Sequence, residues 1–304
     1  MDARAPRTVY DEMLVGASDL HVHVDLEFSR TKFRKALPEW EWLQRAEQAG
    51  MRAVLLKSHL WPTVTTAAAL DQLYSGRVQV ATSVTLNPMV GGVDPWAVEA
   101  AADMGATAVF MPTWGSAGDR EHGGFHKRLA ESFEHFDPAR LSVTSIVDAS
   151  GTLTPPAHEV LRLVQERGML LSTGHIGWRE SLALAQEAHR LGFERLVMAH
   201  PLSVSVDAPH EAVREIVRLG AYAEFCWPTV SPGRRSPAEV VGLIREIGAE
   251  RTILTSDYFG GAGPSPPDLL RLLAGVLYDN GLSVGEIRTA SVTNPAFLLS
   301  LDTG

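Results

Sequence analysis

The sequence alternates short apolar runs with longer amphipathic segments, and this alternation limits the possible folds more than any other feature. Eight runs are rich in β-branched and other apolar residues, as buried strands are: Ser18–His23, Met51–Lys57, Val78–Leu86, Thr107–Met111, Met169–His175, Arg195–His200, Ala221–Phe225 and Thr252–Asp257. Strands that alternate with helices are typical of βα units and a parallel sheet. The sequence therefore predicts an α/β protein.

Segments with helical periodicity separate these runs. They are Glu39–Ala49, Asp94–Met104, Pro156–Arg167, Trp178–Leu191, Pro209–Leu219, Pro237–Ile247 and Pro266–Tyr278. Several end on a glycine just before the next run, as helix C-caps do: Gly50, Gly105, Gly168, Gly192 and Gly220. Eight βα units in 304 residues favour a (β/α)8 TIM barrel. An open doubly wound sheet is the alternative, although no G-x-G-x-x-G follows the first run.

The fourth and fifth runs are unusually far apart. They end at residues 111 and 175, whereas one βα unit takes about 25–35 residues. We therefore expect an insertion over residues 115–150. Its ninth apolar run, Leu141–Ala149, would form one arm of a hairpin after the fourth strand; alternatively, it is a barrel strand. No linker or change in composition divides the chain, so we expect a single domain over residues 1–304.

Composition excludes several classes of function. The single cysteine, Cys226, rules out an internal disulfide and a multi-cysteine zinc site, and it fits a reducing compartment. A net charge of −9 with no basic run argues against nucleic acid or an anionic membrane surface as a partner. No stretch reaches the roughly 18 apolar residues that span a bilayer, and residues 1–16 lack an apolar targeting segment. We therefore expect a soluble, cytoplasmic protein.

Histidines and an aspartate stand at the ends of separate predicted strands. His21 and His23 end the first run, and because they are two residues apart they share one side of a strand. His175, His200 and Asp257 end the fifth, sixth and eighth runs. The carboxyl ends of barrel strands form the active-site face. Imidazoles and a carboxylate that meet there predict a divalent metal, Zn²⁺ first, with Mn²⁺, Fe²⁺ or Co²⁺ as alternatives.

These motifs, in this order, resemble those of the amidohydrolase superfamily. They are Asp19-Leu20-His21-Val22-His23, His175 in STGH, His200 in MAHP and Asp257 in TSD. The closing segment Ser291–Leu301 (SVTNPAFLLSL) is similar to the terminal helix of that superfamily, with Ser300 where Gly is common. The resemblance spans nearly the whole chain. It implies a metal-dependent hydrolase on a distorted (β/α)8 barrel.

The resemblance also implies roles for the individual ligands. His21, His23 and Asp257 would bind the more buried metal, while His175 and His200 would bind a second metal or flank the first. Such a site keeps an open position for water, because its ligands converge on the catalytic face of the barrel.

The sequence departs from the superfamily at the end of the fourth strand. Many binuclear members bridge their metals there with a carboxylated Lys or a Glu, whereas this chain has Phe110-Met111-Pro112-Thr113-Trp114. Lys57 ends the second run instead, where an unpaired ammonium would be costly to bury. We hypothesise that Lys57 is carboxylated and bridges two metals in an atypical branch. In the alternative, a cationic Lys57 binds a substrate carboxylate or pairs with an acid of a mononuclear site.

The expected reaction follows from the metal. Zn²⁺ lowers the pKa of bound water to about 7, so a metal-bound hydroxide would cleave an amide, cyclic amide, lactone or ester bond of a small molecule. Asp257 would act as general acid/base, and His59 could donate a proton to the tetrahedral intermediate. Four tryptophans that follow strand ends are candidates for an apolar or aromatic substrate pocket: Trp61, Trp114, Trp178 and Trp227.

Two other functions stay open. A metal-dependent decarboxylase (a lyase) acting on an aromatic or unsaturated acid fits the missing strand-four bridge and the tryptophans, since some relatives decarboxylate such acids at a mononuclear metal. A non-catalytic, metal-stabilised barrel is the third possibility, although the intact set of ligands argues against a site that has lost its activity. The insertion is a candidate lid or oligomer contact, so a homo-oligomer also stays open.

Overall fold

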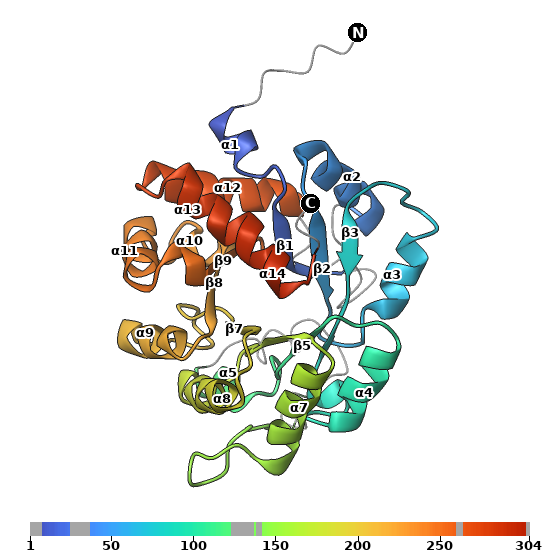
Figure 1. The fold of residues 1–304 in the computed structure, drawn as a ribbon, viewed down its shortest axis with the longest axis vertical. Helices are drawn as coiled ribbons and strands as arrows, with labels where there is room; N and C mark the ends of the chain where they lie inside the picture. Colours follow the sequence, from blue (N-terminus) through green and yellow to red (C-terminus); the bar gives the residue numbers. More distant parts are fainter. Residues whose placement is uncertain (1–7, 25–36, 123–136, 138–141, 260–263, 302–304) are drawn as a thin grey trace.

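The computed structural model describes residues 8–24, 37–122, 137, 142–259 and 264–301. In it, parallel strands run through the centre and helices surround them in chain order (Figure 1). The strands are β1 (Ser18–His23), β2 (Ala53–Lys57), β3 (Gln79–Ala81), β4 (Ser83–Thr85), β5 (Ala108–Phe110), β6 (Leu170–Ser172), β7 (Leu196–Met198), β8 (Tyr222–Cys226) and β9 (Thr252–Thr255). All eight predicted apolar runs contain strands.

The strands pair with their sequence neighbours, as in a barrel. One sheet has the order β1-β2-β3 and the other the order β4-β5-β6-β7-β8-β9, and every pair is parallel. A bridge between Val22 and Tyr258 joins the two ends, with the His23 amide donating to the Tyr258 carbonyl at 3.2 Å. This order has no reversal point, which excludes the open doubly wound sheet. The fold is a distorted (β/α)8 barrel.

The outer helices confirm the predicted periodicity. Those that follow barrel strands are α2 (Glu39–Ala49), α3 (Val64–Leu70), α4 (Pro95–Asp103), α7 (Pro155–Glu166), α8 (Trp178–Leu191), α9 (His210–Arg218), α11 (Pro237–Ile247) and α12 (Pro266–Asp279). Gly50 and Gly192 cap α2 and α8 with φ of 80° and 70°, a left-handed backbone that glycine adopts without strain. The shorter helices are α1 (Val9–Glu12), α5 (Ala117–Glu121), α10 (Trp227–Val230), α13 (Val284–Arg288) and α14 (Asn294–Leu298).

Two sequence-based expectations need correction. The predicted strand Val78–Leu86 is broken at Thr82 into β3, which pairs with β2, and β4, which pairs with β5. The run Leu141–Ala149 forms no regular strand over its described residues, 142–149. Within the described residues it makes only isolated bridges, from Thr144 to Ser116 and from Val147 to Leu153. Residues 123–136 and 138–141 of the predicted insertion lie outside the described part.

Inward-facing side chains divide the barrel interior into an apolar and a polar layer. A buried apolar cluster holds residues of seven strands together with the C-terminal segment: Leu20, Ala53, Leu55, Ala108, Phe110, Leu170, Val197, Tyr222, Ile253, Leu298 and Leu299. Because side chains alternate along a strand, the next inward positions after Leu55 and Tyr222 are Lys57 and Glu224. The interior therefore becomes polar toward the carboxyl ends of the strands.

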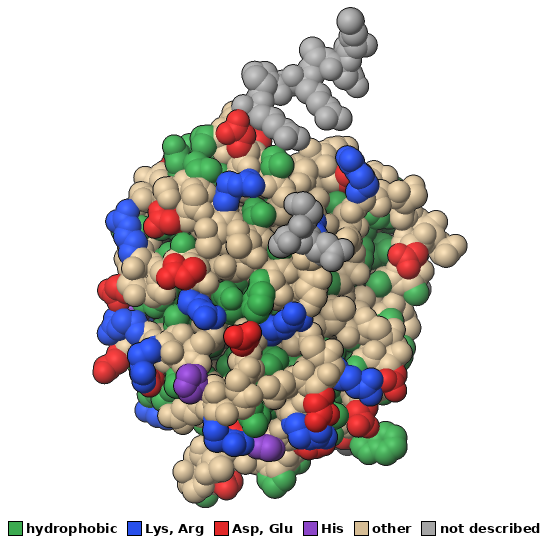
Figure 2. All heavy atoms as spheres, in the orientation of Figure 1, with side chains coloured by type: hydrophobic (Ala, Val, Ile, Leu, Met, Phe, Trp, Pro, Cys, Tyr) green, Lys and Arg blue, Asp and Glu red, His purple; other side chains and the backbone are tan. Residues whose placement is uncertain are grey.

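The C-terminal segment covers the other end of the barrel, where α14 lies across the ring of strands (Figure 1). Ser300, which stands where glycine is common in the resembling superfamily, has a φ of 54°, in the left-handed region that glycine favours. In the same orientation, Figure 2 shows Lys and Arg side chains interspersed with Asp and Glu, with no patch of one sign on this face. Among the described residues, no helix is both long and apolar enough to cross a membrane.

Candidate metal centre

Predicted ligands from three strands meet at the carboxyl end of the barrel. His21 lies in β1, His200 lies two residues after β7, and Asp257 lies two residues after β9. Each offers one ligand atom, and these atoms all lie within 4.8 Å of one another. Both histidines are buried, while 15% of the Asp257 side chain stays exposed. The three residues thus form a compact group of two nitrogen donors and one oxygen donor.

His23 joins this group through Asp257. The Nε2 atoms of His21 and His23 each lie 3.3 Å from Asp257 Oδ1. The two imidazole rings have centroids 5.2 Å apart. The structure therefore places the H-x-H pair and the aspartate together.

A β-bulge in β1 sets the direction of these histidines. Between Asp19 and Val22, β1 carries one residue more than the facing stretch of β2. Asp19 Oδ1 accepts hydrogen bonds from the amides of His21 (3.2 Å) and Ser256 (3.1 Å). Burial raises the pKa of Asp19 to about 7, although the bonds from Ser256 and His21 oppose this shift. Asp19 thus ties the bulge to the segment that carries Asp257.

His175 and His200 lie side by side, with ring centroids 5.2 Å apart. Burial lowers the pKa of His175, and it lowers the pKa of His200 well below its usual value. Both rings therefore stay neutral at physiological pH and keep a nitrogen lone pair. A neutral imidazole is the form that binds a metal.

Backbone strain coincides with two of the candidate ligands. His200 has a φ of 49° and Asp257 a φ of 45°, both in the left-handed region that residues other than glycine seldom adopt. Such conformations cost of order 1–3 kcal/mol and cluster at functional sites. The turns after β7 and β9 therefore hold these side chains in place at an energetic cost.

The charges and donor types of the site fit a divalent metal. Burial raises the pKa of Asp257 to about 8 against the opposing positive charge of Lys57, while Glu224 and Asp19 add to the rise. A carboxylate is therefore unfavourable here unless a cation compensates its charge. Neutral imidazoles with an aspartate oxygen are donors that Zn²⁺ and similar metals accept.

Lys57 lies against a candidate ligand. Its Nζ atom is 2.9 Å from His21 Nε2 and 4.8 Å from the centroid of the Phe110 ring. The side chain is fully buried, and Phe110 occupies the end of β5, where many superfamily members carry a bridging residue. The structure thus brings Lys57 from β2 into the group of predicted ligands.

His59 is the middle ring of a stack. Its ring lies 4.6 Å from that of His23 and 4.1 Å from that of Trp114, both nearly parallel. Both faces of His59 are thus covered, which leaves its ring edge, where the two nitrogens lie, as the part that can meet another group. Trp114 is fully buried and packs against His59.

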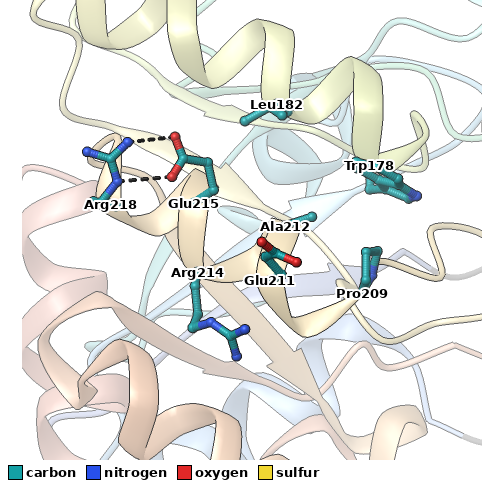
Figure 3. Close-up of a pocket in the computed structure, with 8 residues that line it drawn as sticks. All are labelled: Trp178, Leu182, Pro209, Glu211, Ala212, Arg214, Glu215 and Arg218. Carbon is teal, nitrogen blue, oxygen red and sulfur yellow. Dashed lines mark hydrogen bonds and ion pairs between the residues drawn. The ribbon is translucent and has the colours of Figure 1, made fainter.

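The other three predicted pocket tryptophans are half-buried: Trp61, Trp178 and Trp227. Trp178 lines a surface pocket of about 460 Å³ between α8 and α9. Figure 3 shows Trp178 and Pro209 toward one end of this pocket and the Arg218–Glu215 pair toward the other. None of the metal-centre residues lines this pocket, so the Trp178 ring belongs to the helix layer outside the barrel.

The start of the predicted insertion supports His175. Ser116, the N-cap of α5, donates its hydroxyl to the His175 carbonyl at 2.7 Å. A Cβ on Gly118 would lie 2.5 Å from the Gly177 amide, so α5 packs directly on the backbone of this loop. Asp119 is buried, with Oδ1 3.8 Å from His175 Nδ1 and bonded to Ser205.

Gly174 is required by a close backbone contact. Its φ is 58°, and an added Cβ would lie 2.3 Å from the Met111 carbonyl oxygen. We expect Gly174→Ala to lower stability by about 1–3 kcal/mol and to weaken metal binding, because the adjacent His175 must move. Gly192→Ala is the matched control, since Gly192 has a φ of 70° with no atom within 4 Å of the added Cβ. Thermal melts and metal titrations check both; equal effects on metal binding would contradict this role.

Sequence reasoning missed two buried residues of β8. Glu224 Oε1 lies 2.8 Å from His21 Nδ1, and the Cys226 Sγ atom lies 3.2 Å from His200 Nδ1. Burial raises the pKa of the Cys226 thiol well above its usual value, so it stays protonated. The signal for Glu224 was present as a single acid inside the apolar run AYAEF. Its partner, however, lies 203 residues away in sequence.

Comparisons with solved structures support the fold. A probable 2-pyrone-4,6-dicarboxylic acid hydrolase from Acinetobacter baumannii, solved with citric acid bound, is 13% identical, with a TM-score of 0.56 over 94% of this chain and 100% of the other. A dipeptidase described as a metallopeptidase is 12% identical, with a TM-score of 0.62 over 94% of this chain and 98% of the other. An amidohydrolase from Burkholderia multivorans with bound HEPES is 14% identical, with a TM-score of 0.58 over 94% of this chain and 99% of the other. These neighbours are amidohydrolase-superfamily members, and at these identities the likeness establishes a shared fold.

Sequence comparison places the chain in a family. No curated protein matches it in sequence. One family model matches residues 16–224, a stretch that includes His21, His23, Lys57, His175 and His200 and ends within β8. The chain belongs to the family described as "Family of unknown function (DUF6282)".

Proposed function

We propose that the protein is a metal-dependent hydrolase that cleaves an amide, cyclic amide, lactone or ester bond of a small molecule. The observation that carries the proposal is the meeting of His21, His200 and Asp257 ligand atoms within 4.8 Å at the carboxyl ends of barrel strands. Active sites of (β/α)8 enzymes lie at that end of the barrel. The chain would form an atypical branch of the amidohydrolase superfamily, with Lys57 in place of a strand-four bridge.

The metal is proposed to be Zn²⁺, with Mn²⁺, Fe²⁺ or Co²⁺ as alternatives. His21, His23 and Asp257 would hold the more buried ion, and His175 and His200 would hold a second ion or flank the first. When bound, such a metal acts as a Lewis acid and lowers the pKa of water toward 7.

The residues of the chain itself would move the protons. Asp257 would accept a proton from the attacking water and return it to the leaving group. His59 can offer only its ring edge to a substrate, because His23 and Trp114 cover its faces. We propose that this edge donates a proton to the tetrahedral intermediate. Trp61 and Trp227, which follow β2 and β8, remain candidates for the pocket wall.

Lys57 is proposed to be carboxylated. As a cation, its Nζ, 2.9 Å from His21 Nε2, would compete with a metal for the same lone pair. In the modification, the neutral amine attacks the carbon of CO₂, an N–C bond forms and one N–H proton leaves to solvent. The resulting carbamate supplies oxygen donors that could bridge two metals. The alternative is a cationic Lys57 that binds a substrate carboxylate at a mononuclear site.

Isotope labelling distinguishes these two states of Lys57. The chain has only four lysines, Lys32, Lys35, Lys57 and Lys127, so a carbamate signal is simple to assign. In ¹³C-bicarbonate we expect wild-type protein to show one carbamate carbon that is absent from Lys57→Met, together with two metal ions per chain. Met has a similar volume, so the variant should fold. One ion per chain at full activity, without a carbamate signal, would overturn the bridged site.

A substrate panel tests the proposed reaction. Lactones and dipeptides come first, because two structural neighbours are described as a pyrone dicarboxylic acid hydrolase and a dipeptidase; cyclic imides, phosphotriesters and aromatic acids follow. In H₂¹⁸O the proposal predicts that the product gains one labelled oxygen. Release of CO₂, with no ¹⁸O incorporated into the organic product, would identify a decarboxylase instead. Metal-loaded protein that turns over no member of the panel would favour a non-catalytic barrel.

The cellular setting is part of the same proposal. We propose that residues 1–304 act as a single domain in the cytoplasm, on a small molecule. The single, buried thiol of Cys226 supports a reducing compartment.

A further inference from the structure

Strand β8 points two polar side chains at the metal centre. Along it, Ala223 and Phe225 belong to the main apolar core under the helices, whereas Tyr222 belongs to the cluster inside the barrel. Because side chains alternate along a strand, Glu224 and Cys226 also point inward, one and two layers above Tyr222. Both are buried. Neither was among the predicted ligands.

Glu224 contacts the ring nitrogen of His21 that faces away from the other ligands. Its Oε1 lies 2.8 Å from His21 Nδ1 and accepts a second hydrogen bond from the Thr255 hydroxyl at 2.6 Å. A carboxylate only accepts hydrogen bonds, so the proton of the neutral imidazole belongs on Nδ1. This leaves the lone pair on Nε2, the atom that lies 3.3 Å from Asp257 and 2.9 Å from Lys57 Nζ.

Cys226 makes the equivalent contact with His200. Its Sγ lies 3.2 Å from His200 Nδ1 and 3.8 Å from Asp257 Oδ2, to which the thiol donates. With its proton directed at Asp257, the sulfur can accept from the Nδ1–H of His200. The lone pair of His200 is then again on Nε2. Cys226 therefore contacts two of the three residues whose ligand atoms cluster.

We propose that Glu224 and Cys226 are positioning residues of the metal centre, each fixing one histidine so that its Nε2 faces the metal. The inference rests on the proposed metal centre. It goes further because it states that residues of one strand, β8, set the orientation and the tautomer of both His21 and His200. Partners of this kind typically change metal affinity by about 10–100-fold when they are removed.

Metal titration with a competing chelator tests the inference. We expect Glu224→Leu and Cys226→Ala to bind Zn²⁺ or Co²⁺ about 10–100-fold more weakly than wild type, with little change in the melting temperature of metal-free protein. Glu187→Gln is the matched control, because Glu187 also lies 2.8 Å from a histidine nitrogen, that of His158, on the outer helices. It should bind metal as wild type does.

A second readout reports the tautomer directly. In ¹⁵N-histidine-labelled, metal-free protein, the ring-nitrogen signals of His21 are assigned as those that disappear in His21→Gln. Glu224→Leu should change these signals. If the leucine variant does not fold, Glu224→Met, which keeps a similar length and has no oxygen to accept the hydrogen bond, replaces it. Cys226→Val, which is similar in size and has no polar atom on its side chain, likewise replaces an unfolded Cys226→Ala.

The outcomes separate this inference from the proposed function. Unchanged affinity and unchanged histidine signals in folded β8 variants would overturn the positioning role while wild type still binds metal. Failure of wild type itself to bind Zn²⁺ or Co²⁺ would overturn the proposed metal centre and, with it, this role.

Discussion

Asp257→Asn is expected to lower turnover by about 10²–10⁴-fold while leaving the fold intact, because the amide cannot accept a proton as a carboxylate can. Asp257 Oδ1 lies 3.3 Å from Nε2 of both His21 and His23, so the residue stands at the centre of the candidate site. Asn tolerates the left-handed backbone found at this position, with a φ of 45°, so the substitution adds little strain. Steady-state kinetics on the substrate found by the panel, with thermal melts, measure the effect.

Asp207→Asn is the matched control for this variant. Asp207 also has a left-handed backbone, with a φ of 41°, but its side chain is 56% exposed and pairs with Arg235 at 3.0 Å on the surface. We expect it to keep wild-type turnover. Near-normal turnover of Asp257→Asn would remove this residue from the proton-transfer role, and equal losses in both variants would point to a general effect on folding.

Metal removal is the second large effect. Chelation should abolish turnover and also lower the melting temperature, because a ligand that binds only the folded state stabilises it. At a free metal concentration 100 times Kd the stabilisation is about 2.7 kcal/mol, or roughly 5 °C for a chain of this size. The cause is the group of His21, His200 and Asp257, which gathers donors from segments that separate on unfolding.

Differential scanning calorimetry with and without added Zn²⁺ measures this shift, and activity should return on reloading. His210, on α9, offers a control: it pairs with Glu239 outside the barrel. His210→Ala should show the same metal-dependent shift as wild type, whereas His200→Ala should lose it. A melting temperature that changes with neither Zn²⁺ nor chelator would contradict the proposed centre.

The architecture was predictable because local patterns carry it. The apolar runs and the helices between them follow hydrophobic periodicity, and α2, α8 and α11 begin and end where the sequence predicts. Helix α3 was missed because its residues, VTTAAAL, carry little amphipathic pattern. The break at Thr82 was missed because the two halves of the strand pair with different neighbours. The residues of the strand itself do not reveal which neighbours these are.

The candidate ligands could be named from the sequence, whereas the residues that contact them could not. His21, His23, His175, His200 and Asp257 all lie at the ends of apolar runs, where an otherwise buried strand should finish in turn residues. The contacting residues make long-range contacts, which a single sequence does not reveal. Glu224 on β8 contacts His21 on β1, with β9 between the two strands, and Trp114 stacks on His59.

Direct metal counting tests the central claim. Wild-type protein, stripped with chelator, reloaded with Zn²⁺ and passed through a desalting column, should retain at least one ion per chain by elemental analysis. Removing a ligand in His21→Ala should reduce retention sharply, with Gly192→Ala as a folded control. Wild-type protein that retains no ion, or His21→Ala protein that retains as much as wild type, would contradict the account.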